Sequence, residues 1–254
     1  MVAPQGGLGD LADLAGWIAS WRGRPAVIRP IIALFAGAHA GLDDAGELRA
    51  GMEAVAAGGA AVSRAAAHLG AGLDVYDLAL DRPAGDPALA PAMGERECAA
   101  TMAFGMEALA KQPDLLVLGA LGRGAGVAAA RIAEALHVAS PPGGGLALMA
   151  HLGGRETAAI AGAILAARSQ RVPVLLDGTA ALAAAALLQA AAPGVLDHCR
   201  LGAAPAGEPT AKLLNLTGLR PIIGLKTGLD DATGSAAALA VVRLACALWP
   251  GEDG

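Results

Sequence analysis

The sequence predicts an α/β fold: a three-layer, doubly wound, mostly parallel sheet with helices on both of its faces. Short continuous apolar runs, at residues 30–37, 114–118 and 172–176, are typical of strands that are buried on both sides. Longer stretches with helical periodicity follow these runs, as they do in right-handed βαβ units. A (β/α)₈ barrel is the alternative, but it requires more strands than the chain offers. We expect one domain over residues 1–254.

The elements are expected in a regular order along the chain. Residues 1–29, which include an amphipathic helix at 8–22, are expected to contribute to a small helical lobe. Prolines at 83, 87 and 91 indicate a loop over 81–92, and the run Pro141–Gly145 indicates a linker. Strands are expected at 30–37, 73–80, 114–118, 172–176, 196–201 and 220–225. Further helices are expected at 45–70 with a break near Gly58, at 93–111, up to 136, at 155–168, from 179 onward, at 208–216 and at 233–249.

Composition excludes several classes of protein. The net charge of −5 and the absence of a basic stripe argue against nucleic-acid binding. No apolar run reaches the length of a membrane-spanning helix, and the N-terminus lacks the pattern of a secretory signal. Three scattered cysteines indicate reduced thiols. We therefore expect a cytoplasmic protein with a core of Ala, Val, Leu and Ile.

Asp177 is the first candidate for a functional residue. It follows the buried run 172–176 directly, and ligands of open parallel sheets bind beyond the carboxyl ends of the strands. The alternative is that Asp177 orients the turn at Gly178 or caps the helix that follows.

Two glycine-rich turns are candidates for holding phosphate through backbone N–H groups at a helix start. In the first, Gly122, Arg123 and Gly124 lie between a strand and a helix. Its glycines match neither the dinucleotide pattern nor the triphosphate loop, so a tight packing turn is the alternative. The second turn also precedes a helix and consists of Gly153, Gly154 and Arg155, with Arg155 as a source of positive charge.

Asp231 and His39 complete the candidates. Asp231 follows the last strand and could act as a general base, although Asp231 or Thr233 could also cap the last helix. His39 ends a strand and could contact substrate; His198 has a similar position. No histidines have the spacing of metal ligands, so we expect neither a metal nor another cofactor.

Motifs of high specificity follow one another over nearly the whole chain. They are Pro4-Gln-Gly-Gly-Leu-Gly9, Phe35-Ala-Gly-Ala-His39, Ala57-Gly-Gly-Ala-Ala61, Leu118-Gly-Ala-Leu-Gly-Arg-Gly124, Gly153-Gly-Arg-Glu-Thr-Ala-Ala-Ile-Ala-Gly-Ala-Ile-Leu-Ala-Ala167, Val172-Pro-Val-Leu-Leu-Asp-Gly178 and Leu196-Asp-His198. In this order they resemble the nicotinate-nucleotide–dimethylbenzimidazole phosphoribosyltransferases, the CobT family of cobalamin lower-ligand synthesis.

The resemblance implies a homodimer without a metal. It also implies the transfer of phosphoribose from nicotinate mononucleotide to 5,6-dimethylbenzimidazole, which gives α-ribazole 5'-phosphate. A glutamate near the C-terminus of the family takes the azole proton, and Asp231 occupies the corresponding position here. Positioning and charge placement would carry the catalysis.

The chain departs from the family at the site itself. An Asp and a Glu of the family are replaced by Ala38 and Ala120, and its phosphate-binding Asn-Thr-Thr by residues 125–127. A polar segment of the family aligns with residues 203–210, and the chain is shorter, with much of the loss expected around Val138–Gly145. Two hypotheses follow: an active transferase with a rebuilt site, or a non-catalytic paralogue that acts as a ligand-binding or partner subunit.

Overall fold

The computed structural model describes residues 7–138, 144–225 and 227–249. In this part of the chain the strands are β1 (Pro30–Ala36), β2 (Gly72–Asp77), β3 (Leu115–Leu121), β4 (Val174–Leu176), β5 (Cys199–Ala203) and β6 (Pro221–Ile223). The helices are α1 (Asp10–Arg22), α2 (Ala45–Ala56), α3 (Ala61–Leu69), α4 (Glu95–Gly105), the 3₁₀ turn η1 (Met106–Leu109), α5 (Gly124–Val138), α6 (Gly144–Leu152), α7 (Arg155–Ser169), α8 (Gly178–Ala191), α9 (Pro209–Thr217) and α10 (Thr233–Leu248).

The strands form one sheet in the order β2-β1-β3-β4-β5-β6, and every pairing between them is parallel. The predicted fold class is thus confirmed. β1 lies in register between its neighbours, with Ile31 opposite Gly72 on one side and Leu116 on the other. The chain proceeds outward from β1 to β2 and then returns to add β3 on the other side. The topological switch point, where sheets of this kind bind ligands, therefore lies between β1 and β3.

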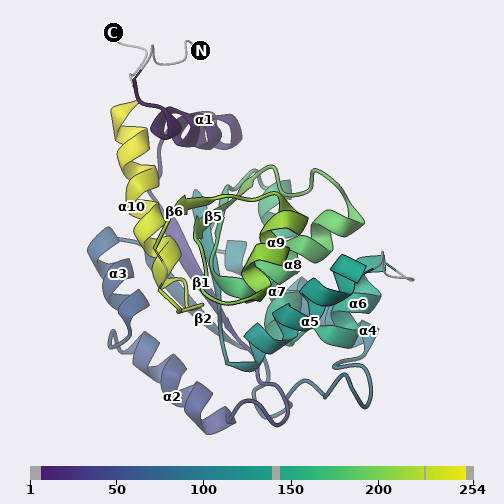
Figure 1. Ribbon diagram of the computed structural model, residues 1–254. Coiled ribbons are helices and arrows are strands. Elements are labelled where there is room, and N and C mark those ends of the chain that lie inside the picture. Colours follow the sequence, from purple (N-terminus) through teal and green to yellow (C-terminus); the bar gives the residue numbers. More distant parts are fainter. Residues whose placement is uncertain (1–6, 139–143, 226, 250–254) are drawn as a thin grey trace.

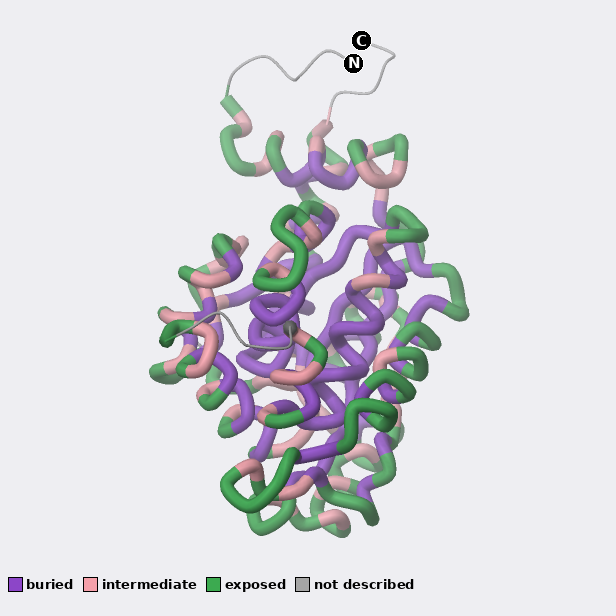
Figure 2. Tube along the Cα trace, turned by 90° about the vertical axis from the view of Figure 1, so that its right-hand side faces the viewer, coloured by how far each residue is buried: buried purple, intermediate pink, exposed green. Residues whose placement is uncertain are grey.

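Helices cover both faces of the sheet (Figure 1). Successive side chains of a strand point to opposite faces, so Ile32 and Leu34 pack with α1, α3 and α10, while Ile31 and Phe35 pack on the other side. On that second side α7 and α8 form the centre of the core, and every residue of α8 from Gly178 to Leu188 is buried. In Figure 2 the buried segments, in purple, gather in the middle of the molecule, and most exposed segments lie at its periphery.

Small residues permit the close helix packing that the scarcity of aromatic residues requires. Where α4 crosses α7, a Cβ atom added at Gly105 would overlap the backbone of Ala159, and one added at Gly162 would overlap the backbone of Met102. At these two points the helix backbones touch. The high glycine and alanine content thus serves backbone-to-backbone packing in the core.

The structure differs from the expectation in several places, and β2 and β6 both end earlier than expected, at Asp77 and Ile223. β3 continues to Leu121, three residues beyond the expected end at Leu118. α6 occupies residues that the sequence assigned to no helix. β5 begins at Cys199, because the preceding residues form a turn. Residues 4–6 of the first motif and residues 139–143 of the predicted linker lie outside the described residues.

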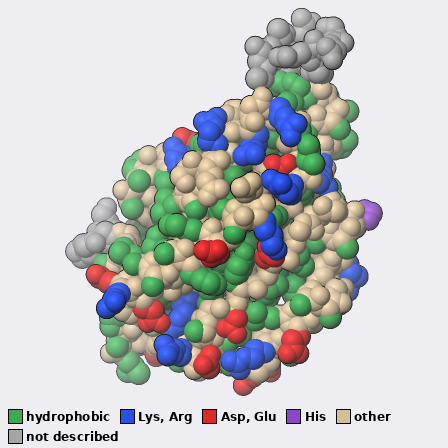
Figure 3. All heavy atoms as spheres, turned by 180° about the vertical axis from the view of Figure 1, so that it is seen from behind, with side chains coloured by type: hydrophobic (Ala, Val, Ile, Leu, Met, Phe, Trp, Pro, Cys, Tyr) green, Lys and Arg blue, Asp and Glu red, His purple; other side chains and the backbone are tan. Residues whose placement is uncertain are grey.

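α1 lies at one end of the molecule, away from the centre of the sheet, and packs against α10 (Figure 1). None of the helices described is both long enough and apolar enough to cross a membrane. On the face drawn in Figure 3, acidic and basic side chains are interspersed with hydrophobic ones.

Candidate functional site

A cavity of about 410 Å³ lies at the carboxyl end of β3, beside the topological switch point. Its walls come from the start of α2, from the turn between β3 and α5, and from the loop that precedes α10. Five carboxylates line it, together with one basic side chain. The lining residues are Asp43, Asp44, Glu47, Leu48, Ala120, Leu121, Gly122, Arg123, Gly126, Gly228, Leu229, Asp230 and Asp231.

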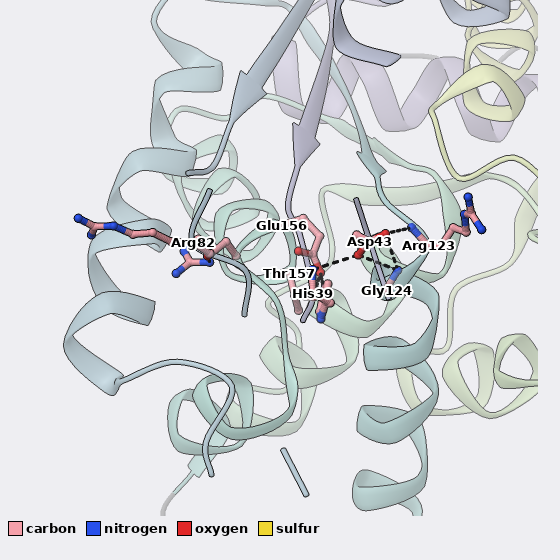
Figure 4. Close-up of polar contacts among 8 residues, drawn as sticks. His39, Asp43, Arg82, Arg123, Gly124, Glu156 and Thr157 are labelled. Atoms are coloured by element: carbon pink, nitrogen blue, oxygen red, sulfur yellow. Dashed lines mark hydrogen bonds and ion pairs between the residues drawn. The ribbon is translucent and has the colours of Figure 1, made fainter. Parts of the chain in front are cut away.

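Asp43 ties the end of β1 to the start of α5. Its carboxylate accepts hydrogen bonds from the backbone N–H groups of His39 (3.0 Å), Arg123 (2.7 Å) and Gly124 (3.1 and 3.2 Å), as Figure 4 shows. The first N–H groups of a helix have no partner within the helix and favour negative charge. In this structure a carboxylate of the chain itself therefore occupies two of the donors that the sequence assigned to phosphate.

This turn requires glycines because neighbouring atoms approach its backbone too closely to leave room for a Cβ atom. Gly122 has a φ of +124°, and a Cβ atom there would lie 2.7 Å from the carbonyl oxygen of Gly37. A Cβ atom at Gly124 would lie 2.5 Å from both the Asp43 carboxylate and the His39 side chain. Between them the Arg123 guanidinium is exposed and donates to Glu47 over 3.0 Å. Arg123 is thus the cation at the mouth of the cavity.

His39 and Glu156 form a buried ion pair behind the cavity. Nε2 of His39 lies 3.1 Å from Oε1 of Glu156, and their side chains are 5% and 0% exposed. Burial lowers the pKa of His39, but the hydrogen bond and the charge of Glu156 outweigh it, so the net pKa is raised. Burial likewise raises the pKa of Glu156, yet its bond to His39 brings the net value below the usual range. Both shifts favour the charged forms of the two side chains, the imidazolium and the carboxylate.

The second glycine turn makes room for this pair. A Cβ atom at Gly154 would overlap the Glu156 carboxylate and Nε2 of His39, and one at Gly37 would overlap Oε2 of Glu156. Gly153 donates its N–H to the Met149 carbonyl oxygen at 2.9 Å and lies between α6 and α7. Neither Gly153 nor Gly154 lines the cavity beside β3. Their observed contacts are with the protein itself.

Arg155 points to a different place. Its guanidinium is buried and bonds to the Glu97 carboxylate, with 3.1 Å between Nε and Oε1, and to the carbonyl oxygen of Arg82. With Asp77 and Phe104 it lines a separate cavity of about 290 Å³ between β2 and α4. Arg155 is the first residue of α7, and it lines this second cavity rather than the one beside β3.

Asp177 and Asp230 each cap a helix other than the one that follows them in the chain. Although Asp177 occupies the N-cap position of α8, its side chain makes no capping bond to that helix, so the alternative role as a local cap is not observed. It accepts instead from the N–H groups of Ala232 (2.9 Å) and Ser235 (2.7 Å) at the start of α10. Asp230, which precedes α10, accepts from the N–H (3.2 Å) and the hydroxyl (2.7 Å) of Thr179 in α8. Burial raises the pKa of Asp177 to about 6.

Asp231 lies between these contacts and lines the cavity. Its Oδ1 accepts the N–H of Thr233, the first residue of α10, at 3.0 Å. A half-buried carboxylate at a cavity wall can accept a proton from a bound ring nitrogen.

The structure thus brings together some of the predicted residues and separates others. Gly122, Arg123 and Asp231 line one cavity, and His39 and Gly124 join it through Asp43. His198 is buried, bonds to the Ile164 carbonyl oxygen at 3.0 Å, and belongs to the core.

Sequence reasoning missed Asp43, Glu156 and Asp230. Their partners are distant along the chain: 117 residues separate His39 from Glu156. Only the acidic pair at 230–231 gave a local signal. In the part of the chain that the structure describes, no group of three or more His, Cys, Asp or Glu residues could hold a metal ion.

Comparisons with known proteins show the family to which the chain belongs. A family model described as phosphoribosyltransferase matches residues 1–143 and 129–251. The chain belongs to this family. A relative from Allorhizobium ampelinum, named nicotinate-nucleotide–dimethylbenzimidazole phosphoribosyltransferase, is 42% identical over 99% of the chain and 85% of its own length. A relative of the same name from Agrobacterium fabrum is also 42% identical, over 99% of the chain and 84% of its own length.

Solved structures of the phosphoribosyltransferase family agree with the fold. A crystal structure of CobT from Thermus thermophilus superposes with a TM-score of 0.85 at 26% identity, and the match covers 94% of the chain and 89% of that protein. The two matches of the family model overlap over residues 129–143.

Proposed function

We propose that the chain transfers phosphoribose from nicotinate mononucleotide to 5,6-dimethylbenzimidazole, giving α-ribazole 5'-phosphate for the lower ligand of cobalamin. The observation that carries the proposal is the position of Asp231. It lines the cavity at the topological switch point, in a chain that is 42% identical over 99% of its length to a relative named for this reaction. Asp231 is then the general base.

The charges of the cavity support this chemistry. Transfer breaks the bond from C1' of the ribose to the pyridinium nitrogen and forms a bond from C1' to a benzimidazole nitrogen, and Asp231 takes the proton of the azole. Positive charge develops at C1' as the bond breaks. The carboxylates of Asp230 and Asp231 line the cavity and are placed to stabilise that charge.

Arg123 and the turn around it are placed to bind the phosphate. The guanidinium is exposed at the cavity, and the N–H groups of Arg123 and Gly124 become available to phosphate once the Asp43 carboxylate leaves them. His39 and Gly154 support this wall through the buried pair with Glu156. Gly122 lines this cavity, and Asp177 holds the loop that carries Asp231. Gly153 and Arg155 lie outside it and support α7.

We also propose that the protein acts as a homodimer in the cytoplasm. The family resemblance supports the dimer, and the three free cysteines support a reducing compartment. Light scattering of the purified protein tests the dimer: a mass of two chains is expected, and a single-chain mass contradicts it.

The decisive experiment incubates the protein with nicotinate mononucleotide and 5,6-dimethylbenzimidazole and measures α-ribazole 5'-phosphate by mass spectrometry. Asp231→Asn keeps the size of the side chain but cannot accept the proton, so kcat should fall by a factor on the order of 10²–10⁴. The wild-type chain must turn over for the proposal to hold. Equal turnover by the Asp231→Asn variant would exclude Asp231 as the base.

A second candidate function is a ligand-binding subunit without catalysis. The specific observation in its favour is Asp43, which fills the anion-binding donors at the start of α5. Binding of dimethylbenzimidazole or nicotinate mononucleotide in calorimetry, without any product, would establish this alternative.

A further inference from the structure

The loop that carries Asp231 is fixed on both of its sides by the central strands. On one side, the Asp230 carbonyl oxygen accepts the N–H of Ala120 in β3 at 3.0 Å. On the other side, the N–H of Ala232 donates to Asp177, directly after β4, at 2.9 Å. The direction in which Asp231 faces the cavity is therefore set by its two neighbours.

The two aspartates cap each other's helices, which would not be expected if each served only to cap the helix that follows it. A local N-cap satisfies helix donors within a few residues. Here Asp177 starts α8 but caps α10, while Asp230 precedes α10 but bonds to Thr179 in α8. The exchange couples both helix starts to the short segment 230–232. Two local caps would remove the bonds that link this segment to residues 177 and 179.

Two features of this arrangement lower the stability of the folded protein. Asp177 is 2% exposed, and its burial as a carboxylate opposes folding. Ala232 has a φ of +68°, a left-handed conformation that raises the energy of a residue with a Cβ atom by about 1 kcal/mol or more. Strain of this kind persists where the surroundings fix the backbone, and it gathers at functional sites.

Glycines leave the space that the loop needs. A Cβ atom at Gly178, whose φ is +79°, would lie 2.6 Å from the Asp230 side chain. One at Gly119 would lie 2.8 Å from the backbone nitrogen of Ala232, and one at Gly234 would lie 3.1 Å from the Asp177 carboxylate. Residues of β3 and α8 are thus small where they meet segment 230–232, and Gly234 of α10 is small where it meets Asp177.

We propose that Asp177 is a positioning residue for the transfer reaction: it orients Asp231 through the N–H groups of Ala232 and Ser235, and Asp230 holds the loop from the other side. The inference rests on the proposed function, in which Asp231 is the base. A base displaced by about 1 Å loses on the order of a hundredfold in rate. Asp177 contributes to catalysis without touching the substrate.

Asp177→Asn tests this directly. The amide keeps the shape and one acceptor but turns an NH₂ group toward one of the two backbone N–H donors. We expect kcat to fall roughly 100-fold while KM for nicotinate mononucleotide changes by less than about threefold, because the phosphate-binding wall is untouched. Exchange of the amide hydrogens of segment 230–236 should become faster, as measured by mass spectrometry.

Asp114→Asn is the matched control. Asp114 also accepts two backbone N–H groups from a distant segment, those of Ile28 (2.6 Å) and Arg29 (2.8 Å), but at the amino end of β3. Both variants should lose stability, and only Asp177→Asn should lose kcat per folded molecule. A purely structural role would give the two variants the same kinetics.

The pH profile gives a second readout. Asp230 is the ionisable group whose charge acts on Asp177. A protonated Asp177 presents an O–H group where an N–H donor points, so kcat of the wild type should decline as the pH falls below about 6. In Asp177→Asn the part of the decline centred near pH 6 should be absent, because the amide does not titrate there.

A milder variant keeps the test valid if Asp177→Asn does not fold. Thr179→Val removes the hydroxyl that donates to Asp230 while it keeps the volume of the side chain, and it should reduce kcat several-fold. Wild-type kcat in Thr179→Val, and in Asp177→Asn where that variant folds, would overturn the positioning role and leave Asp231 as the base. An inactive wild type would instead remove the proposed function, and this inference with it.

Discussion

Replacing His39 by Ala should strongly destabilise the protein, because it leaves the Glu156 carboxylate buried without its partner. The two side chains lie 3.1 Å apart and are almost fully buried. Breaking such a pair by removing one member destabilises by about 3–5 kcal/mol. For a chain of this size, that corresponds to a decrease in the melting temperature of roughly 10 °C.

The pH dependence follows from the directions of the two pKa shifts. The pKa of His39 is raised, so its contribution is complete below 6.5 and disappears as the pH rises through its higher folded value. The pKa of Glu156 is lowered, so its contribution exists above 4.5 and disappears as the pH falls through its lower folded value. The destabilisation by His39→Ala should therefore be greatest between these two pH values.

Thermal and urea unfolding, at pH steps across this range, measure the effect. His68→Ala, at an exposed histidine of α3, is the control and should leave stability nearly unchanged. Adding Glu156→Gln to His39→Ala removes the unpaired charge and should recover about 1 kcal/mol or more. A loss below about 1 kcal/mol in His39→Ala, or no recovery in the double variant, would refute the buried ion pair.

Two further variants test the turn at α5 and the helix packing. Asp43→Ala frees the N–H groups of Arg123 and Gly124, so the affinity for inorganic phosphate should rise about tenfold in calorimetry, while the lost cap lowers stability by about 1 kcal/mol. Asp44→Ala removes a carboxylate from the same cavity without freeing these donors; an equal gain in Asp44→Ala would contradict the explanation. Gly162→Ala should destabilise by about 3 kcal/mol or more in urea unfolding, because its Cβ atom overlaps the backbone of Met102 in α4. Gly51→Ala, at an exposed helical position with no atom near the added Cβ, should be neutral or stabilising.

Most of the fold could be predicted from the sequence, because its strands and helices are encoded locally. The apolar runs that became β1 and β4 end at glycine and at Asp177, as expected. The glycine-rich start of α6 resembles a linker in isolation, and the helix is stabilised by packing against α4, α5 and α8. β3 extends past Leu118 because Gly119 and Ala120 pair with β1, a long-range contact that no local pattern contains.

The candidate site was predicted less completely than the fold. Asp231 and the turn at Arg123 were found because each lies between a strand and a helix. Asp43 and Glu156 gave no local signal, because their partners come from other elements.

The sequence by itself determined the fold class, the family motifs and the side of the sheet on which chemistry can occur, because strand ends and glycine turns are local features. Only the tertiary structure decided what the residues of these motifs contact. In the tertiary structure Gly154 lies against the ion pair of His39 and Glu156. The Asp177 carboxylate caps α10 rather than α8, the helix that follows it. The physical reason is that buried charges and helix ends take their partners from whatever packing brings near, and packing joins segments that are far apart in the chain.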